Sequence, residues 1–272
     1  MAPSRTLRPY AFIGVIWAVL MAAAVGAGFV PKGAAVGLPP TDRGLDSTLY
    51  VRTSAEYRAC CLQAYALAEE RVKAKLTARS KGGKPAAVVL DLDETVIDNT
   101  GFQARQVQTR QATFDENQWD EWERDDRGQV RFVPGAKEFL AFLKARGVEA
   151  VYITNRSERR RKELHALLKR LDIDVPDDQL LLYDPGTKSS DKTGRRDKAS
   201  QAFDVVLWVG DNLRDFDNVF KYDKRGAVGR KEAVDERRAK FGTDWIILPN
   251  PLYGEWTKGF ANTRADAGLL TK

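Results

Sequence analysis

Ala86-Ala-Val-Val-Leu-Asp-Leu-Asp-Glu-Thr95 is the stretch of sequence on which the fold prediction rests. It begins as a short, uninterrupted apolar run and ends in acidic residues. Such a run is typical of a strand that is buried on both faces in a parallel sheet. Because the acids come at its carboxyl end, we expect this strand to deliver the carboxylates of Asp91 and Asp93 to the edge of the sheet.

The same pattern recurs further along the chain, where apolar runs again end in polar or acidic residues. Helical segments lie between these runs: one follows Pro134 and stops at Gly147, and another begins at Asn155 or Ser157 and continues to Arg170. Strands that alternate with helices predict a doubly wound α/β domain with a parallel sheet. The strands predicted after the first one span residues 148–154, 180–183, 205–210 and 245–248.

A helix is predicted ahead of the first strand. Thr53-Ser-Ala-Glu56 has the spacing of a capping box, which starts a helix by pairing free backbone amides with side chains, and the helical pattern continues to about residue 78. Cys60 and Cys61 are adjacent, and neighbouring residues form only a strained disulfide. We therefore expect two reduced thiols that pack the helix. The apolar side of the helix is predicted to carry Ala59, Cys60, Ala64, Leu67 and Val72.

Charge and histidine content restrict the function classes. The chain of 272 residues carries 44 Lys and Arg against 38 Asp and Glu, a net charge of +6. The first 50 residues account for +2 of this charge, with four basic against two acidic residues, so we do not expect binding to a nucleic-acid polymer. His165 is the only histidine, which excludes a zinc site that needs two histidines. The chemistry must rest on carboxylates, hydroxyls and lysines.

The first 30 residues are predicted to be a targeting segment. Arg5 and Arg8 precede an uncharged run over residues 11–30, the pattern of a signal peptide or of an uncleaved membrane anchor. Alanine and glycine make its second half weakly hydrophobic, which favours cleavage. The folded part is expected to be exported to the periplasm, the cell envelope or the medium, and to touch the membrane only if this segment is retained. A linker is predicted over residues 31–45 and the domain over 46–272.

Polar residues at the predicted strand ends define a candidate site. In an open parallel sheet, ligands bind outside the carboxyl ends of the strands. Four carboxylates that meet there without histidine or a matching number of cations require a metal ion, and oxygen ligands favour Mg²⁺. Lys192 follows a predicted strand and supplies a fixed positive charge, so the combination predicts phosphoryl transfer. The residues gathered at the strand ends are Asp91, Asp93, Thr154, Asn155, Asp211 and Asp215.

At these residues the chain resembles the haloacid dehalogenase superfamily of phosphatases. Asp91-Leu-Asp-Glu-Thr95 is similar to the first motif of that superfamily, and Thr154 matches the second. Lys192 matches the third motif, and Gly210-Asp-Asn-Leu-Arg-Asp215 the fourth. The resemblance implies a haloacid dehalogenase-like fold.

Further stretches narrow the resemblance to the class C acid phosphatases, a bacterial envelope group that includes lipoprotein 5′-nucleotidases. Ile153-Thr-Asn-Arg156 and Leu248-Pro-Asn-Pro-Leu-Tyr-Gly254 are similar to that family, and the resemblance extends over residues 49–256. Many members carry a lipobox cysteine after the signal segment. No cysteine precedes Cys60 here, so we do not expect a lipid anchor of that kind.

The resemblance implies a mechanism with a covalent intermediate. Asp91 attacks the phosphorus and forms an aspartyl-phosphate, while Asp93 protonates the leaving oxygen and later activates water. Mg²⁺ is held by Asp91, by the backbone carbonyl of Asp93 and by Asp211.

The resemblance also implies which residues bind the substrate. Thr154 and Lys192 bind the phosphoryl oxygens, and Asp215 orients Lys192 or a metal-bound water. We expect Asn155, which follows Thr154, to bind the substrate as well.

An insertion over residues 99–133 interrupts the alternation of strands and helices and carries Phe114, Trp119 and Trp122. We expect it to form a small aromatic-rich cap over the site, with Trp122 packing the insertion onto the domain. Trp119 and Tyr253 resemble positions that stack the base or aromatic ring of the substrate in this family.

The implied function is Mg²⁺-dependent hydrolysis of small phosphomonoesters, including nucleoside 5′-monophosphates and aromatic monoesters. One alternative is a protein phosphatase, because Asp-Leu-Asp-Glu-Thr is also the signature of nuclear phosphatases that act on phosphoserine. Export and the aromatic insertion argue against it. Another alternative is a catalytically weak protein of the same fold that binds or stores a phosphate ligand, against which the presence of Asp91 argues. The sequence leaves a homodimer open.

Overall fold

The structure is a computed structural model that describes residues 44–259, except 81, 112–113 and 127. The predicted signal peptide or anchor over residues 1–30 lies outside the described residues, as does most of the predicted linker. Among the residues that are described, no helix combines the length and the apolarity needed to cross a membrane.

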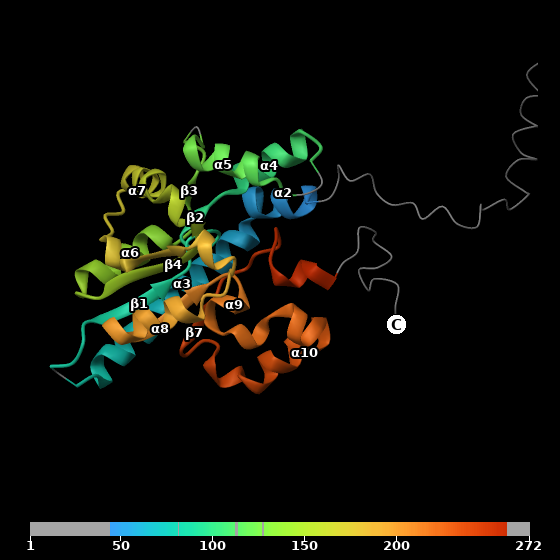
Figure 1. The fold of residues 1–272 in the computed structure, drawn as a ribbon. Helices are drawn as coiled ribbons and strands as arrows, with labels where there is room; N and C mark the ends of the chain where they lie inside the picture. The colour runs from blue at the N-terminus through green and yellow to red at the C-terminus, as the bar shows by residue number, and fades with distance from the viewer. Residues whose placement is uncertain (1–43, 81, 112–113, 127, 260–272) are drawn as a thin grey trace, which may run out of the picture. The chain divides into compact units, whose positions relative to one another are not determined.

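A parallel sheet forms the centre of the described part of the chain (Figure 1). Its strands are β1 (Ala86–Leu90), β4 (Glu149–Ser157), β5 (Leu180–Tyr183), β6 (Asp204–Gly210) and β7 (Trp245–Ile247). They lie in the order β5-β4-β1-β6-β7, and every neighbouring pair is parallel. The predicted α/β fold with a parallel sheet is confirmed. Because β1 pairs with both β4 and β6, the residues that follow these three strands are neighbours at one edge.

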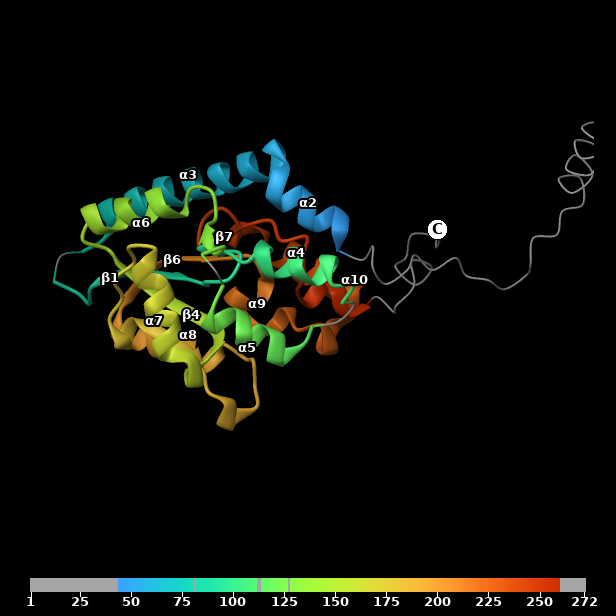
Figure 2. The same ribbon diagram turned by 90° about the horizontal axis from the view of Figure 1, so that it is seen from above.

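Helices cover both faces of this sheet (Figure 2). The helices outside the insertion after β1 are α2 (Leu45–Thr53), α3 (Ala55–Ala78), α6 (Ala136–Ala145), α7 (Arg161–Arg170), α8 (Thr193–Ala202), α9 (Leu213–Phe216) and α10 (Tyr222–Glu236). Side chains of β1 alternate between the two faces: Val88 and Leu90 join the core with α3, α6 and α7, whereas Ala87 and Val89 join Ala199 of α8. This cover explains why β1 is apolar at every position and buried along its whole length.

The helix ahead of β1 differs from the prediction at its first residue and in part of its packing side. Ser54, not Thr53, caps α3, because its hydroxyl oxygen accepts a hydrogen bond from the Tyr57 amide at 3.0 Å. Both cysteines are free, but only Cys61 is buried and Cys60 is exposed. The prediction was therefore wrong for Ala59 and Cys60, which are exposed, but right for Val72, which is buried, and Ala64 and Leu67 are partly buried against the core. The core-facing residues of α3 are Tyr57, Cys61, Tyr65, Ala68 and Val72.

The insertion after β1 is closed at its base by a short antiparallel strand pair. Its elements are β2 (Ile97–Asp98), α4 (Thr100–Gln108), α5 (Glu116–Arg124) and β3 (Arg131–Phe132). Phe102 joins the two helices, with ring centroids 5.0 Å from Trp119 and 6.0 Å from Trp122. Trp122 is buried, and its indole donates to Asn99 Oδ1 at 3.3 Å. Trp122 thus connects α5 to the end of β2, as expected for a packing residue.

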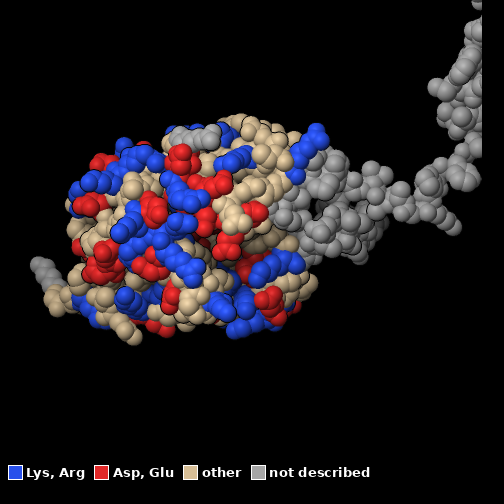
Figure 3. All heavy atoms as spheres, turned by 45° about the horizontal axis from the view of Figure 1, so that its top comes forward, with Lys and Arg blue, Asp and Glu red and all other residues tan. Residues whose placement is uncertain are grey.

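Surface charge is mixed in sign on the face that Figure 3 draws. Basic and acidic side chains are interspersed there, in keeping with the near balance of 44 Lys and Arg with 38 Asp and Glu. The basic residues that bear on chemistry are different ones: Lys192 and Arg156 are buried at the carboxyl edge of the sheet.

Candidate active site

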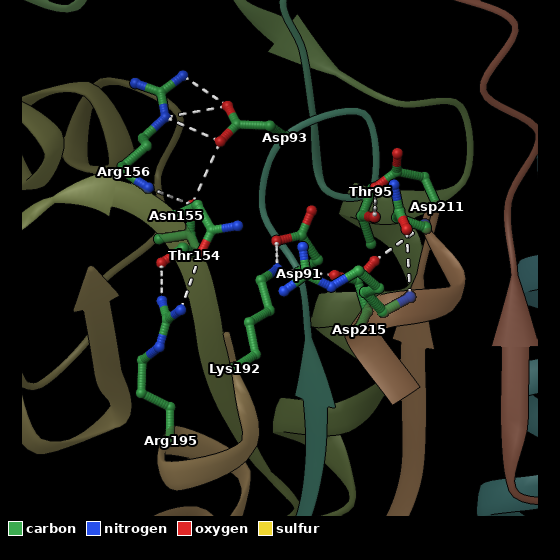
Figure 4. A network of polar contacts seen from close by, with 12 residues as sticks. Asp91, Asp93, Thr95, Thr154, Asn155, Arg156, Lys192, Arg195, Asp211 and Asp215 are labelled. Carbon is green, nitrogen blue, oxygen red and sulfur yellow. Dashed lines mark hydrogen bonds and ion pairs between the residues drawn. The ribbon is translucent and has the colours of Figure 1, made fainter. Parts of the chain in front are cut away.

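Acidic residues meet where β1 and β6 end (Figure 4). Asp91 directly follows β1, and its amide extends the sheet pairing by donating to the Val209 carbonyl of β6 at 3.0 Å. Asp211 directly follows β6, and Asp215 lies in α9. Carboxylate oxygens of these three aspartates lie within 4.8 Å of one another. The structure thus brings together Asp91, Asp211 and Asp215, which the sequence placed at strand ends.

A buried lysine faces these carboxylates. Lys192 immediately precedes α8 and is 6% exposed. Its ammonium donates to Asp215 Oδ1 at 2.8 Å and also to Asp91 Oδ1. Burial lowers the pKa of Lys192, but the carboxylates of Asp215 and Asp91 outweigh this effect and raise the pKa above its ordinary value. The lysine therefore carries a fixed positive charge against three acids.

Lys192 balances only part of the negative charge of the three aspartates, which makes this edge of the sheet suited to a divalent metal ion. Burial raises the pKa of Asp91 well above its ordinary value, although Lys192 lowers it, and burial together with Asp215 raises the pKa of Asp211 to about 6. These directions mean that the folded protein disfavours the ionised acids, and a bound cation relieves that repulsion. Carboxylate oxygens are also the ligands that hard cations prefer. Charge and donor type therefore both fit a divalent ion.

Neutral side chains orient Asp211. Thr95 Oγ1 donates to Asp211 Oδ1 at 3.1 Å, and Asn250 Nδ2 donates to Oδ2 at 2.7 Å. Thr95 is itself held, because its carbonyl accepts the Tyr65 hydroxyl of α3 at 2.6 Å. Partners of this kind set the direction of a carboxylate and tune its use as a ligand.

Asp93 lies at the same edge, but its side chain points away from Asp91 (Figure 4). Its carboxylate accepts hydrogen bonds from Arg156 Nε and Nη2 at 2.9 and 2.8 Å. Asn99 Nδ2 donates to it at 2.8 Å and Thr154 Oγ1 at 3.2 Å. The four acids that we expected to converge therefore form two groups. Asp91, Asp211 and Asp215 lie together beside Lys192, whereas Asp93 pairs with Arg156.

Thr154 and Asn155 lie near the end of β4 between two arginines. Thr154 is buried, and its hydroxyl oxygen accepts the Arg156 amide at 3.1 Å. Asn155 is exposed, and its Oδ1 accepts a hydrogen bond from Arg195 Nη2 at 2.7 Å. Arg195 also donates to the Thr154 carbonyl. The edge thus presents a hydroxyl, an amide and the Arg195 guanidinium beside the acids, which suits an oxyanion such as a phosphoryl group.

A model of the HAD superfamily, subfamily IIIB (Acid phosphatase), matches residues 41–256 of the chain. The chain belongs to this family. Two solved structures of the class C acid phosphatase from Bacillus anthracis, one with tungstate bound, are each 32% identical to it with a TM-score of 0.72. The tungstate-bound structure matches over 85% of this chain and 92% of that chain, the other over 86% and 93%. The resemblance drawn from the motifs is confirmed, and the protein is an acid phosphatase, a phosphomonoester hydrolase.

In this phosphatase, Trp119 and Tyr253 lie next to different parts of the carboxyl edge of the sheet. The ring of Trp119 is half-buried, and the Arg156 guanidinium lies over it at 5.1 Å from the ring centroid. Tyr253 is 38% exposed, and its amide donates to Asn250 Oδ1 at 3.4 Å. Trp119 therefore adjoins the arginine that pairs with Asp93, and Tyr253 adjoins the asparagine that holds Asp211.

Sequence reasoning missed several residues of the phosphatase site. Asn250 comes shortly after β7, so the rule that ligands lie beyond strand ends could have found it. Arg195 lies three residues after Lys192, and no such rule identified it as a site residue. Arg156 stood inside a quoted motif, but its partner Asp93 is 63 residues away, and local sequence does not show which acid an arginine will meet.

Gly210 is expected to be sensitive to substitution, because Asp215 packs directly against it. A methyl group at Gly210 would lie 2.5 Å from Asp215 Oδ2 and 2.7 Å from its Cβ. We expect Gly210→Ala to displace Asp215, to destabilise the fold by about 1–3 kcal/mol and to lower kcat/KM at least about tenfold. Urea unfolding and kinetics measure both effects. Gly194→Ala is the control, since a methyl group there meets no atom within 4 Å, and equal effects of both changes would contradict the prediction.

Proposed function

We propose that this phosphatase hydrolyses small phosphomonoesters through an aspartyl-phosphate on Asp91, with nucleoside 5′-monophosphates and aromatic monoesters among its substrates. The observation that carries the proposal is the position of Asp91. It follows the central strand, it accepts a hydrogen bond from the Lys192 ammonium, and its carboxylate lies within 4.8 Å of those of Asp211 and Asp215. A carboxylate next to a fixed positive charge and a potential metal site suits nucleophilic attack on phosphorus.

In the first step, an Asp91 oxygen attacks phosphorus and the bond to the leaving oxygen breaks. The Asp93 carboxyl group gives its proton to that oxygen. As a carboxylate, Asp93 then takes a proton from a water that attacks the aspartyl-phosphate and releases Asp91 and inorganic phosphate. The Lys192 ammonium and the Thr154 hydroxyl bind phosphoryl oxygens, while Asp215 holds Lys192. The similar Bacillus anthracis enzyme has been solved with tungstate bound, and tungstate is a tetrahedral oxyanion like phosphate, which supports a phosphoryl ligand for this phosphatase.

Mg²⁺ is the metal ion that we propose for the acidic residues. Asp91 and Asp211 would hold it through carboxylate oxygens, and Asp93 through its backbone carbonyl. Asp215 is within reach of the same position, and its hydrogen bond from Lys192 also allows it to orient the lysine. When bound, Mg²⁺ neutralises charge on the phosphoryl group.

A panel of phosphomonoesters, assayed with and without EDTA, tests the proposed function. We expect hydrolysis of nucleoside 5′-monophosphates and aromatic monoesters, a more than about tenfold fall in EDTA and recovery with added Mg²⁺. A marked preference for phosphoserine peptides would favour a protein phosphatase instead. Binding of phosphate ligands without turnover would favour the storage alternative.

Tyr253→Ala is expected to weaken hydrolysis only of substrates that carry a ring. Stacking on one aromatic side chain is worth about 1–3 kcal/mol, so kcat/KM for a nucleoside 5′-monophosphate should fall about tenfold to a hundredfold. Ethyl phosphate has no ring and should be hydrolysed as before. Tyr253→Phe keeps the ring and serves as the control. Trp119→Ala should reduce both activities, because Trp119 also packs on Phe102 and Arg156. Equal losses on both substrates in Tyr253→Ala would reject stacking by this residue.

A further inference from the structure

Arg156 lies buried between the active site and the cap insertion, with a carboxylate on each side. Its side chain is 2% exposed, and it bonds Asp93 through Nε and Nη2. Its Nη1 lies 3.6 Å from Glu123 Oε1 of α5. The guanidinium also donates to Asn99 Oδ1 at 2.9 Å and lies over the ring of Trp119. Residues of the active site and residues of the cap therefore both contact the Arg156 side chain.

This arrangement sets the direction of the Asp93 carboxylate. A planar guanidinium that donates two N–H groups to one carboxylate defines the plane and distance of the pair. Buried ion pairs add little net stability compared with apolar packing, so orientation is the main consequence of this contact. Glu123 and Trp119, on the other side of Arg156, both belong to α5. The cap thus takes part in orienting Asp93.

The direction of Asp93 agrees with protonation of a leaving group. In-line attack places the leaving oxygen on the side of phosphorus opposite to the nucleophile. An acid that serves this oxygen must therefore point away from Asp91, as the Asp93 side chain does (Figure 4). Proton transfer also requires the acid within hydrogen-bond reach of that oxygen.

We propose that Arg156 is a positioning residue for Asp93, and that Glu123 and Trp119 of the cap hold Arg156 in place for this task. The inference rests on the general-acid role of Asp93 in the proposed function. A displacement of about 1 Å in an active site can reduce the rate about a hundredfold. In kcat/KM, which covers the steps up to departure of the leaving group, loss of the arginine geometry therefore matters only where the leaving oxygen needs a proton.

The leaving-group dependence of Arg156→Lys tests this inference in the full-length enzyme with Mg²⁺. Benzyl phosphate releases an alkoxide that needs a proton, whereas 4-nitrophenyl phosphate releases a stable phenolate, and both carry a ring. We expect kcat/KM to fall at least about tenfold for benzyl phosphate and less than about threefold for 4-nitrophenyl phosphate. The ratio of the two values does not depend on the fraction of folded enzyme. Equal losses on both substrates would overturn the inference.

Asp93→Asn separates the inference from the proposed function. We expect it to show the same selectivity with a larger loss on benzyl phosphate, about 10²-fold to 10⁴-fold. If kcat/KM falls equally on both substrates, Asp93 is not the general acid, and the positioning inference fails with it. If Asp93→Asn is selective and Arg156→Lys is not, only the positioning inference fails.

Glu123→Gln provides a second variant in case Arg156→Lys does not fold. Burial raises the pKa of Glu123 to about 7, although Arg156 lowers it, so a neutral side chain of the same shape is tolerated there. We expect a selective loss of about threefold or more on benzyl phosphate. Arg160→Lys is the matched control, because Arg160 pairs with Asp120 of the same helix at 3.1 Å. A selective loss in Arg160→Lys, or no selectivity in Glu123→Gln, would overturn the part of the inference that assigns a role to the cap.

Discussion

Asp91→Asn is expected to lower kcat/KM by more than about 10⁴-fold. Asparagine has nearly the same shape as aspartate, but its amide is a poor nucleophile, so the aspartyl-phosphate does not form. The fold should remain intact. Asp91 is 8% exposed, and burial already disfavours its ionised form, so a neutral side chain removes an unfavourable charge and Tm should not fall.

Kinetics with 4-nitrophenyl phosphate and a thermal unfolding curve measure the two parts of this prediction. Asp204→Asn is the matched control, because Asp204 starts β6 at the opposite end of the sheet and pairs with Arg79 at 2.6 Å. That variant should keep its activity. Undiminished hydrolysis by Asp91→Asn would remove the covalent mechanism.

Lys192→Met is expected to reduce kcat/KM about 10²-fold to 10³-fold, because it removes the fixed charge that binds the phosphoryl oxygens. It should also destabilise the metal-free protein by about 3–5 kcal/mol, since Asp91 and Asp215 lose their buried counter-charge. Added Mg²⁺ should recover part of this stability, as a cation replaces some of the lost charge.

Denaturant unfolding in EDTA and in Mg²⁺, together with kinetics, tests the Lys192 prediction. Lys198→Met is the control, because Lys198 is exposed on α8. If Lys192→Met retained activity within about tenfold of the wild type, Lys192 would not be the group that binds the phosphoryl oxygens. Equal destabilisation by both changes would show that the two carboxylates do not depend on Lys192.

The strands and their polar ends could be predicted from sequence because they depend on short stretches of chain. A strand covered on both faces must be apolar at consecutive positions, and β1 and β5 satisfy this rule over Ala86–Leu90 and Leu180–Tyr183. Parallel strands end at the same edge of a sheet, so the sequence placed the acids that follow β1 and β6 at one edge. The pairing of β1 with β6, which the structure shows, makes Asp91 and Asp211 neighbours.

The choice between adjacent residues on α3 was not decided by local sequence. Cys60 and Cys61 are equally apolar, and a helix turns by less than a third of a circle per residue. The rotation of α3 follows from its fit against the sheet, where Tyr57 and Tyr65 are buried. Cys61 is therefore in the core and Cys60 is exposed.

The orientation of the acids was decided by the tertiary structure. The sequence determined that Asp93 lies two residues after Asp91, and its resemblance to known phosphatases implied its role. Which way its carboxylate points depends on Arg156 from β4 and Asn99 from the insertion. Arg156 meets Asp93 only because the folded chain places segments 63 residues apart side by side. Charge pairs and hydrogen bonds between such segments set side-chain direction, and short stretches of sequence contain no information about them.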